Sequence, residues 1–307
     1  MNFFNRLLDA TILYSFDKNG FARHQKQFTP LKNNLAQKRY LITGANAGLG
    51  KATAFELAQR NAEVWMLCRN QQKAEESRRE IIQQTKNTNI HILIVDISCL
   101  QSIKAAVKQF HPTTIDCLIH NAGVLPNSRE ETAQGFELCV ATNVIGPFLL
   151  NHLLMPKMNP SGRIILVSSG GMYPVKLNLK QLETPPSPYN GVQAYAQTKR
   201  AQVILGELWA KQLAPIKVHT MHPGWADTDG VKTSIPKFYK KTKNILRSPE
   251  QGADTIVYLA TEDDLQSGLF WFDRKPRKTH FLPWTRETNT TRDKLLEQLK
   301  SWTKIDQ

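Results

Sequence analysis

The pentapeptide "YAQTK" places a phenol, Tyr195, four residues before an ammonium, Lys199. On a helix this spacing brings both side chains to one face. Reduction of a carbonyl to an alcohol adds a hydride to carbon and a proton to oxygen, and a tyrosine hydroxyl can supply the proton. The ordinary tyrosine pKa of about 10 is too high for this work at neutral pH. A cation about 4 Å away would stabilise the phenolate by roughly 4 kcal/mol at an effective dielectric of about 20. Any long helix can carry this pattern, so alone it is weak evidence.

A glycine-rich segment, "TGANAGLG" at residues 43–50, follows the apolar run "RYLIT" and precedes a helical stretch. Glycines allow a tight turn and a close approach of the backbone to a pyrophosphate, and the free N–H groups of the next helix favour its negative charge. A strand, a glycine turn and a helix in this order predict dinucleotide binding. The candidate contacts here are Thr43, Gly44, Asn46, Gly48, Leu49 and Gly50.

Short apolar runs alternate with amphipathic stretches from residue 38 onward. The runs are continuously apolar, as expected of parallel strands buried on both faces. This alternation predicts an α/β fold, a single-domain doubly wound parallel sheet flanked by helices. Ser98 is the candidate N-cap of the third helix. We predict strands over 39–43, 63–68, 91–96, 115–120, 162–169 and 216–222, a late edge strand over 268–273, and helices over 49–60, 70–85, 99–110, 134–158 and 193–213.

The glycine spacing is Gly-x-x-x-Gly-x-Gly, and "NAG" (121–123) follows the fourth predicted strand, well before the Tyr-x-x-x-Lys pair. In this order the motifs resemble the short-chain dehydrogenase/reductase family, and more narrowly its retinol-dehydrogenase-like reductases. The resemblance covers roughly residues 38–275. It implies a Rossmann-type fold and an NAD(P)-dependent enzyme that acts on CH-OH groups and interconverts a carbonyl (ketone or aldehyde) and an alcohol.

The resemblance also assigns cofactor contacts beyond the glycine turn. It makes Asp96 the partner of the adenine amine and Asn121 a structural residue near the cofactor. His120 is a departure, since the family often has Asn there, and we interpret it as a packing residue. The contacts implied are Asp96, Asn121, Ala122 and Gly123, then Pro223, Gly224 and Thr228 in the turn over the nicotinamide, with Lys199 on the ribose and Tyr195 beside it.

Two further polar residues complete the implied catalytic set with Tyr195 and Lys199. Ser169 ends the fifth predicted strand, where its hydroxyl can hold the substrate oxygen beside the tyrosine. Ser168 competes for this role, but strand alternation points the two serines to opposite sides, and the family pattern favours Ser169. Asn143, in "ATNVIGP", matches the family's asparagine that supports a water leading to the lysine.

Arg69 indicates which nicotinamide cofactor binds. In dinucleotide folds a carboxylate about 20 residues after the glycine motif binds the ribose hydroxyls of NAD, whereas an arginine accommodates the phosphate of NADP. Arg69 lies 19 residues after Gly50, and no acid occurs from 64 to 74. Asn46 could add a hydrogen bond and Lys73 a favourable field. We therefore predict NADP(H) over NAD(H).

The sequence leaves two other functions open. A cofactor-binding module without catalysis would need the glycine turn, but it gives no reason for Ser169, Tyr195 and Lys199 to occur together. A nucleotide-sugar epimerase or dehydratase usually has a larger C-terminal sugar domain, and only about 80 residues follow Gly224.

The small-molecule substrate is expected to be lipophilic. Residues 229–247 are the predicted lid of the catalytic domain, as in the family. In this segment Ile235, Phe238 and Tyr239 are mixed with lysines. That combination suits an apolar molecule with a negative or polar end.

The flanks of the catalytic domain, which we place at 38–285, have separate interpretations. Residues 1–37 form an extension, and residues 286–307 a tail with a helix over 286–303. Two hypotheses for the extension are equally favoured: a helix packed on the domain, or an interfacial helix that brings residues 1–30 onto an anionic membrane. The apolar residues at helical spacing are Phe3, Phe4, Leu7, Leu8, Thr11 and Ile12.

Composition limits the remaining partners. The net charge of +14 raises nucleic acid or an anionic membrane, but no nucleic-acid motif accompanies it, so we expect a solvated basic surface and no nucleic acid. The four cysteines show no CxxC spacing, which predicts reduced core residues and no metal site. With no apolar run of 18 residues and no signal peptide, we expect a cytoplasmic protein, with a homo-oligomer left open.

Overall fold

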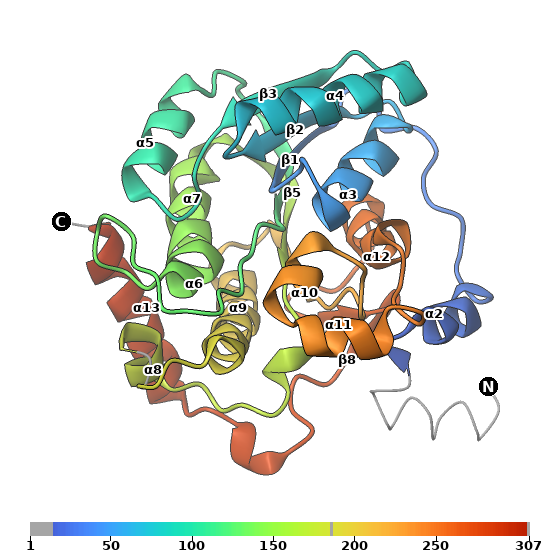
Figure 1. Ribbon diagram of the computed structural model, residues 1–307. Helices are drawn as coiled ribbons and strands as arrows, with labels where there is room; N and C mark the ends of the chain where they lie inside the picture. The colour runs from blue at the N-terminus through green and yellow to red at the C-terminus, as the bar shows by residue number, and fades with distance from the viewer. Residues whose placement is uncertain (1–14, 185–186, 306–307) are drawn as a thin grey trace.

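An eight-stranded sheet forms the centre of the computed structural model, which describes residues 15–184 and 187–305 (Figure 1). The strand order is β3-β2-β1-β4-β5-β6-β7-β8. Neighbouring strands are parallel from β3 to β7, and β7 and β8 are antiparallel. The strands are β1 (Arg39–Thr43), β2 (Glu63–Cys68), β3 (Ile90–Ile94), β4 (Ile115–His120), β5 (Met158–Val167), β6 (Lys217–Met221), β7 (Phe270–Phe272) and β8 (Lys275–Arg277).

The strand order reverses at β1, which lies between β2 and β4. Successive strands are added in opposite directions on the two sides of this point, so the loops after β1 and β4 diverge. In an open parallel sheet such a switch point leaves a ligand crevice at the carboxyl ends of the strands. The predicted α/β doubly wound sheet is confirmed, and the glycine turn and "NAG" both follow the strands at the switch point.

Helices cover both faces of the sheet (Figure 1). Neighbouring strand residues point to opposite faces, so each strand contributes to two cores. Leu41 and Leu118 pack in one core with α5, α7 and α9, whereas Ile42 and Ile119 pack in the other with α3, α4 and α12. The helices are α2 (Lys18–Gln25), α3 (Gly48–Ala58), α4 (Gln71–Thr85), α5 (Leu100–Gln109), α6 (Leu138–Val140), η2 (Ala141–Ile145), α7 (Gly146–Leu154), η3 (Met155–Lys157), η4 (Gly170–Met172), α8 (Leu179–Glu183), α9 (Gly191–Gln212), α10 (Asp229–Ser234), α11 (Pro236–Thr242), α12 (Pro249–Thr261), η5 (Pro283–Thr285) and α13 (Asn289–Thr303).

The long helix predicted over 134–158 differs from the structure at its start and in its interior. It begins at Leu138, because the Glu137 carboxylate accepts hydrogen bonds from the N–H groups of Cys139 and Val140 and caps the chain there. It is then divided into α6, a π-helical turn η2, α7 and the 3₁₀ turn η3.

Ser98 does not cap the third predicted helix, so that prediction is wrong. Helix α5 begins after Cys99, which makes no side-chain capping bond. The Ser98 hydroxyl and its main-chain N–H both donate to Asp96 Oδ1, at 2.6 and 2.8 Å. The hydroxyl is therefore engaged in a turn before the helix, a competition that short polar side chains commonly show.

The last part of the sheet also extends beyond the prediction. The late strand exists as β7, but it is not the edge, because the chain turns and returns as the antiparallel strand β8. Asp273 and Arg274 make this turn with positive φ values of 49° and 55°. The C-terminal helix was predicted correctly: Leu295 and Leu299 of α13 are fully buried.

The described part of the N-terminal segment packs on the domain. Phe16 and Phe21 are 5% and 3% exposed. Phe16 contacts His222 and Phe272 edge-on, with ring centroids 4.2 and 5.1 Å apart. The packing hypothesis therefore holds for this part. The apolar stripe from Phe3 to Ile12 lies outside the described residues, so the membrane hypothesis stays a prediction.

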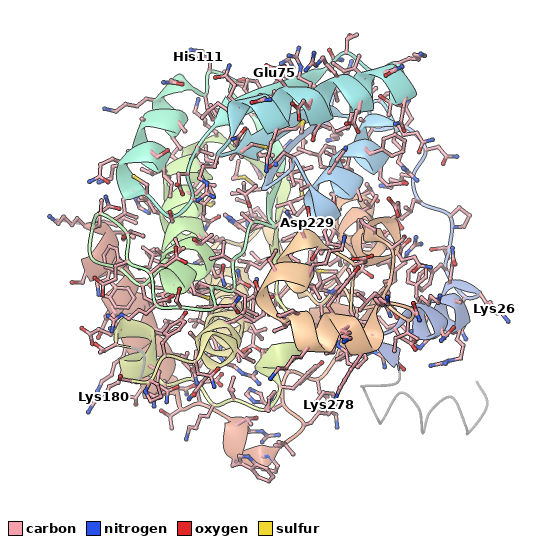
Figure 2. The ribbon with its side chains drawn as sticks, in the orientation of Figure 1. Lys26, Glu75, His111, Lys180, Asp229 and Lys278 are labelled. Carbon is pink, nitrogen blue, oxygen red and sulfur yellow. The ribbon has the colours of Figure 1, made fainter. Side chains whose placement is uncertain are left out.

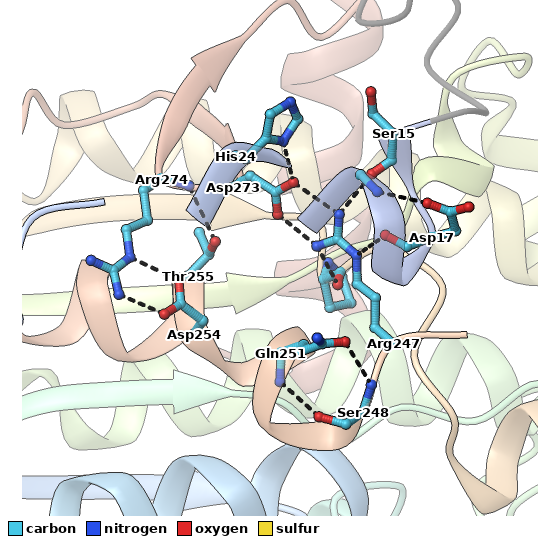
Figure 3. Close-up of polar contacts among 12 residues, drawn as sticks. Ser15, Asp17, His24, Arg247, Ser248, Gln251, Asp254, Thr255, Asp273 and Arg274 are labelled. Atoms are coloured by element: carbon cyan, nitrogen blue, oxygen red, sulfur yellow. Dashed lines mark hydrogen bonds and ion pairs between the residues drawn. The ribbon is translucent and has the colours of Figure 1, made fainter. Parts of the chain in front are cut away.

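A buried ionic cluster fastens this segment to the domain (Figure 3). The Arg247 guanidinium donates to both carboxylate oxygens of Asp273, at 2.6 and 2.8 Å, and to the Ser15 carbonyl at 2.7 Å. His24 Nδ1 lies 2.6 Å from Asp273 Oδ2. Burial alone would raise the pKa of Asp273, but the hydrogen bonds from His24 and Arg247 hold it below its usual range.

The basic residues are spread over the surface. Figure 2 shows Lys26, Lys180 and Lys278 at separate edges of the molecule, and all three are exposed. Among the described residues one helical stretch, Leu138–Lys157, is long and apolar enough to cross a membrane, and 78% of its apolar window is buried inside the protein.

We predict that Asp273→Asn lowers the free energy of unfolding at pH 7 by about 3 kcal/mol, because it leaves the buried Arg247 charge without its carboxylate. Urea denaturation measures this change. Since the folded pKa of Asp273 lies below the unfolded value of about 3.9, its contribution is present above that pH and is lost as the pH falls through the folded value. The difference between wild type and variant should therefore narrow below about pH 4.

Asp263→Asn is the matched control. Asp263 also pairs with an arginine, Arg163, but its side chain is 65% exposed, so the loss should stay below about 1 kcal/mol. Equal losses in the two variants would show that the Arg247–Asp273 pair has no special role in stability.

Candidate active site

The glycine turn after β1 forms an open cradle at the start of α3. Gly44 and Gly48 have positive φ values of 68° and 51°, which glycine adopts without strain. A Cβ at Gly50 would lie 2.2 Å from the Gly44 carbonyl oxygen, so only glycine lets the helix begin this close to the turn. Ala47 precedes α3 and makes no side-chain cap. Uncapped N–H groups beside a glycine turn fit a cofactor pyrophosphate.

Asn121 ties the end of β4 to this turn. Its side-chain amide donates to the carbonyls of Thr43 and Gly44, at 2.9 and 3.3 Å. The Thr43 hydroxyl in turn accepts from the main-chain N–H groups of Asn121 and Ala122, at 3.0 and 2.9 Å. A Cβ at Gly123 would lie 3.3 Å from Lys199 Nζ. The "NAG" segment thus joins the glycine turn to the residues around the lysine.

His120, just before this segment, is fully buried against Trp209. Burial lowers the pKa of His120 to about 3. Neither of its ring nitrogens has a hydrogen-bond partner among the described residues. These properties agree with the interpretation of His120 as a neutral packing residue.

Arg69 follows β2 and Asp96 comes soon after β3, so the two residues lie together at the carboxyl ends of these neighbouring parallel strands. Arg69 Nη1 is 3.8 Å from Asp96 Oδ2, and their side chains are 73% and 33% exposed. Lys73 is on α4, whose first turn is capped by the Asn70 side chain. The Asn46 carbonyl accepts from the Ser77 hydroxyl of the same helix at 2.8 Å. The Arg69 guanidinium is thus largely exposed and has the Asp96 carboxylate as its ionic partner.

The loop after β6 comes back over the glycine turn. A Cβ at Gly48 would lie 3.2 Å from the Thr228 side chain, which places this loop against the turn. Gly224 has a φ of 81°, and a Cβ there would lie 2.4 Å from Arg247 Nε. Arg247 also pairs with the loop through its backbone: its N–H donates to Trp225 and its carbonyl accepts from Asp227, at 2.7 and 2.8 Å.

The predicted lid, 229–247, contains α10 and α11. Figure 2 labels Asp229, the residue at which α10 begins. Phe238 of α11 packs edge-on against Trp225, with ring centroids 5.2 Å apart. The lid thus presents aromatic groups next to the turn that contains Pro223.

Tyr195 and Lys199 lie one turn apart on α9. Lys199 Nζ is 5.3 Å from the centroid of the Tyr195 ring. Burial raises the pKa of Tyr195 to about 12, against the opposing effect of a hydrogen bond with the Ser169 hydroxyl. Burial lowers the pKa of Lys199 to about 8. The expected lowering of the phenol pKa is therefore not found, because the effect of burial exceeds that of the hydrogen bond with Ser169.

The two serines after β5 take opposite sides, as strand alternation predicts. The Ser168 hydroxyl is buried and donates to the Lys199 carbonyl at 2.9 Å. The Ser169 hydroxyl faces Tyr195 and accepts from the N–H of Gly171 at 3.2 Å. His222 supports this corner, since its Nδ1 accepts from the N–H of Gly170 at 3.0 Å. Ser169 is thus the serine that the fold brings to the phenol.

Asn143 lies in the π-helical turn η2 and is fully buried. Its side chain makes a pair of hydrogen bonds with the main chain of Val124, at 2.9 and 3.1 Å, and donates to the Thr198 hydroxyl at 3.0 Å. The side chain therefore fixes the segment after "NAG" to α9. The main-chain carbonyl of Asn143, and not its side chain, is connected to Lys199. This carbonyl accepts a hydrogen bond from Gln202, which also contacts Lys199.

Two cavities lie outside this set of residues. One of about 450 Å³ is bounded by α7, α9 and α13. Another of about 220 Å³ lies behind η4 and is lined by Phe16, Tyr173 and Phe281. Ser169, Tyr195 and Lys199 line neither of them.

Comparison with known proteins now bears on this arrangement. The model of the short chain dehydrogenase family matches residues 38–180. Dehydrogenase/reductase SDR family member 12 from Homo sapiens is 40% identical over 297 residues, which are 94% of each chain. The chain belongs to the short-chain dehydrogenase/reductase family. Retinol dehydrogenase 11 from Mus musculus is 33% identical over 241 residues, or 76% of each chain. The retinol-dehydrogenase-like resemblance is thereby confirmed.

Membership establishes the general activity. The protein is an NAD(P)-binding oxidoreductase that acts on CH-OH groups, and this favours neither alternative raised from the sequence. A crystal structure of a short chain dehydrogenase from Escherichia coli CFT073 complexed with NADPH has the same fold, with a TM-score of 0.65 and 20% identity. It covers 80% of this chain and 100% of that chain.

Three residues that contact this family site were not singled out from the sequence. Arg247 holds the loop over the glycine turn, His222 supports the backbone next to Ser169, and Gln202 contacts Lys199. Gln202 could have been noticed, because it lies three residues after Lys199 on the same helix. Arg247 and His222 act through contacts across the chain, for which the sequence carried no signal.

We predict that Gly50→Ala weakens NADPH binding at least tenfold, since the new methyl group must separate the turn from α3, at a cost of about 1–3 kcal/mol. Fluorescence titration with NADPH measures this. Gly230→Ala is the control, because the nearest atom to its Cβ would be 3.9 Å away. Wild-type affinity in Gly50→Ala would contradict the cradle.

Proposed function

We propose that the protein is an NADP(H)-dependent short-chain reductase that interconverts a lipophilic ketone or aldehyde and the corresponding alcohol, with Tyr195 as the acid/base. The observation that carries this proposal is the position of three side chains: the Ser169 hydroxyl interacts with the Tyr195 phenol, and the Lys199 ammonium lies 5.3 Å from the phenol ring. Ser169 follows β5, and Lys199 Nζ would lie 3.3 Å from a Cβ at Gly123, in the segment that follows β4.

In this proposal each side chain has a separate task. Bound NADPH supplies the hydride. The Ser169 hydroxyl holds the carbonyl oxygen beside Tyr195, and the phenol donates the proton to the developing alkoxide. A phenol pKa of about 12 keeps the donor protonated through neutral pH. Lys199 stabilises the phenolate that remains and binds the ribose hydroxyls.

Cofactor binding is assigned to the residues at the switch point. The glycine turn and the start of α3 bind the pyrophosphate. Asp96 binds the adenine amine, and Asn121 has a structural role near the cofactor. Pro223, Gly224 and Thr228 cover the nicotinamide. Arg69 binds the 2′-phosphate of NADP. The exposed Arg69 guanidinium supports this assignment, because its forked donors suit a phosphate.

The substrate is assigned to the side of the crevice next to the lid. Trp225 and Phe238 provide a half-buried aromatic pair there, and exposed lysines follow on α11. We therefore propose an apolar carbonyl compound with a polar or anionic end. NADPH oxidation with a panel of long-chain aldehydes, retinal and quinones identifies it.

Tyr195→Phe should lower turnover at least a hundredfold with the best aldehyde, because it removes the proton donor and leaves the ring. NADPH affinity should change little. Tyr258→Phe on α12 is the matched control and should keep full turnover, since Tyr258 packs on Arg274 away from the site. Retention of most activity by Tyr195→Phe would disprove the proposed acid/base.

Arg69→Asp should reverse the cofactor preference. Charge-assisted hydrogen bonds contribute about 1.5–3 kcal/mol, so NADPH should bind roughly tenfold to a hundredfold more weakly in the variant. NADH affinity should hold or improve. Titration of both cofactors measures this, with Arg79→Asp on α4 as the control for net charge. Equal affinities of wild type for the two cofactors would overturn the assignment.

A further inference from the structure

The Lys199 ammonium is held by two acceptors from the protein. The residue is 3% exposed. Nζ donates to the Val167 carbonyl at 2.8 Å and to Gln202 Oε1 at 3.1 Å. An ammonium has three N–H donors, so among the described residues these two bonds leave one donor for a further acceptor. The titratable groups that face Lys199 are Tyr195 on its own helix and Cys139 on α6.

The other end of Gln202 reaches Asn143. Gln202 is fully buried, and its Nε2 donates to the Asn143 main-chain carbonyl at 2.8 Å. An amide has one accepting and one donating end. Here the oxygen faces the ammonium and the nitrogen faces the carbonyl, so this one orientation satisfies both partners.

The Asn143 carbonyl is open to Gln202 for a reason visible in the sequence. In an α-helix it would accept from the N–H of residue 147, but Pro147 has no N–H to give. The chain adopts the π-helical turn η2 at this point. Such turns are frequent at functional sites.

We propose that Gln202 is a positioning residue for the reaction: its amide connects the Asn143 carbonyl directly to the Lys199 ammonium and holds that ammonium charged and aimed at the site. This inference rests on the proposed function. It replaces the water expected between Asn143 and Lys199 with a side chain. Because an amide does not titrate near neutral pH, Gln202 fixes the lysine and does not relay its proton.

If Gln202 had only a structural role, the loss of another buried glutamine bridge on the same helix should have an equal effect. Gln197, five residues earlier on α9, is also a buried glutamine that bridges two groups, both of them on the main chain: its amide donates to the Lys176 carbonyl at 3.0 Å and accepts from the Asn178 N–H at 2.9 Å. No contact joins its described bonds to Lys199. Gln197→Leu is therefore a matched control for the loss of a buried glutamine bridge.

The test follows the titration of Lys199 by NMR in full-length, cofactor-free protein labelled with ¹³C at lysine Cε, with Lys199→Arg to assign the signal. Wild type should titrate near pH 8. In Gln202→Leu the ammonium loses an acceptor, so its midpoint should fall by about one unit, a tenfold loss of proton affinity. Gln197→Leu should keep the wild-type midpoint.

Gln202→Ala provides the second arm. Removing the side chain leaves a polar space between two hydrogen-bonding groups, which a water can occupy. A crystal structure of this variant should show a water bonded to the Asn143 carbonyl and Lys199 Nζ, and its midpoint should lie between those of wild type and Gln202→Leu. Turnover of NADPH with nonanal should fall about tenfold in Gln202→Leu and less in Gln202→Ala.

An unchanged midpoint in Gln202→Leu, or an equal shift in Gln197→Leu, overturns the inference. If Gln202→Leu does not fold, an unchanged midpoint in Gln202→Ala with no bridging water overturns it as well. The proposed function fails separately, through an active Tyr195→Phe. The Lys199 titration needs neither cofactor nor substrate, so the two failures are distinguishable.

Discussion

The burial of one charge, the Lys199 ammonium, sets the conditions for the rest of the site. A cation away from water is costly unless hydrogen-bond acceptors surround it. This one finds them on β5, through the Val167 carbonyl, and on α9, through Gln202, which is itself held by η2. Three separate elements must therefore keep their mutual positions for the lysine to remain charged. The same elements carry Ser169, Tyr195 and Asn143, so the requirement to satisfy one cation also fixes the geometry of the hydroxyl pair.

A second buried cation, Arg247, has a comparable effect at the loop that follows β6. Asp273 neutralises it, and its remaining donors bond carbonyls of the N-terminal segment. Its backbone meanwhile pairs with the loop that follows β6. The N-terminal residues from Ser15 onward are thus connected to the loop over the cofactor cradle. A buried pair of this kind is weak evidence for net stability, but breaking it is costly. The cost of breaking the Arg247–Asp273 pair therefore holds the loop after β6 in one position.

The sequence predicted most of the fold because the strong signals are local. Three central strands, β1, β2 and β4, have the bounds expected from their apolar runs. A parallel strand buried on both faces is continuously apolar, so its ends coincide with the first polar residues. Helix α12 was missed even though its start carries a capping box made by Ser248 and Gln251. This helix contains Gly252 and directly follows the basic segment that ends at Arg247, so its apolar pattern is weak. The hairpin of β7 and β8 was missed because it depends on a tight turn with positive φ at Asp273 and Arg274, and arginine, unlike aspartate, has little intrinsic preference for that conformation.

The candidate site was predicted as a set of residues but not as a set of contacts. Motif spacing placed Tyr195, Lys199 and Ser169 at one edge of the sheet, and the structure brings these three together. Strand alternation predicted that the two serines point to opposite sides, and the family pattern selected Ser169 as the one that faces the phenol. The sign of the pKa shift at Tyr195 did not follow, because it depends on how much water each group loses, and spacing says nothing about that loss. The role of the Asn143 carbonyl likewise depends on Pro147, four residues later, whose missing N–H makes the carbonyl available. That cause was present in the sequence. The bond between this carbonyl and Gln202 could not be predicted, because it depends on α9 passing beside η2 with a glutamine at that point. Only tertiary packing decides this.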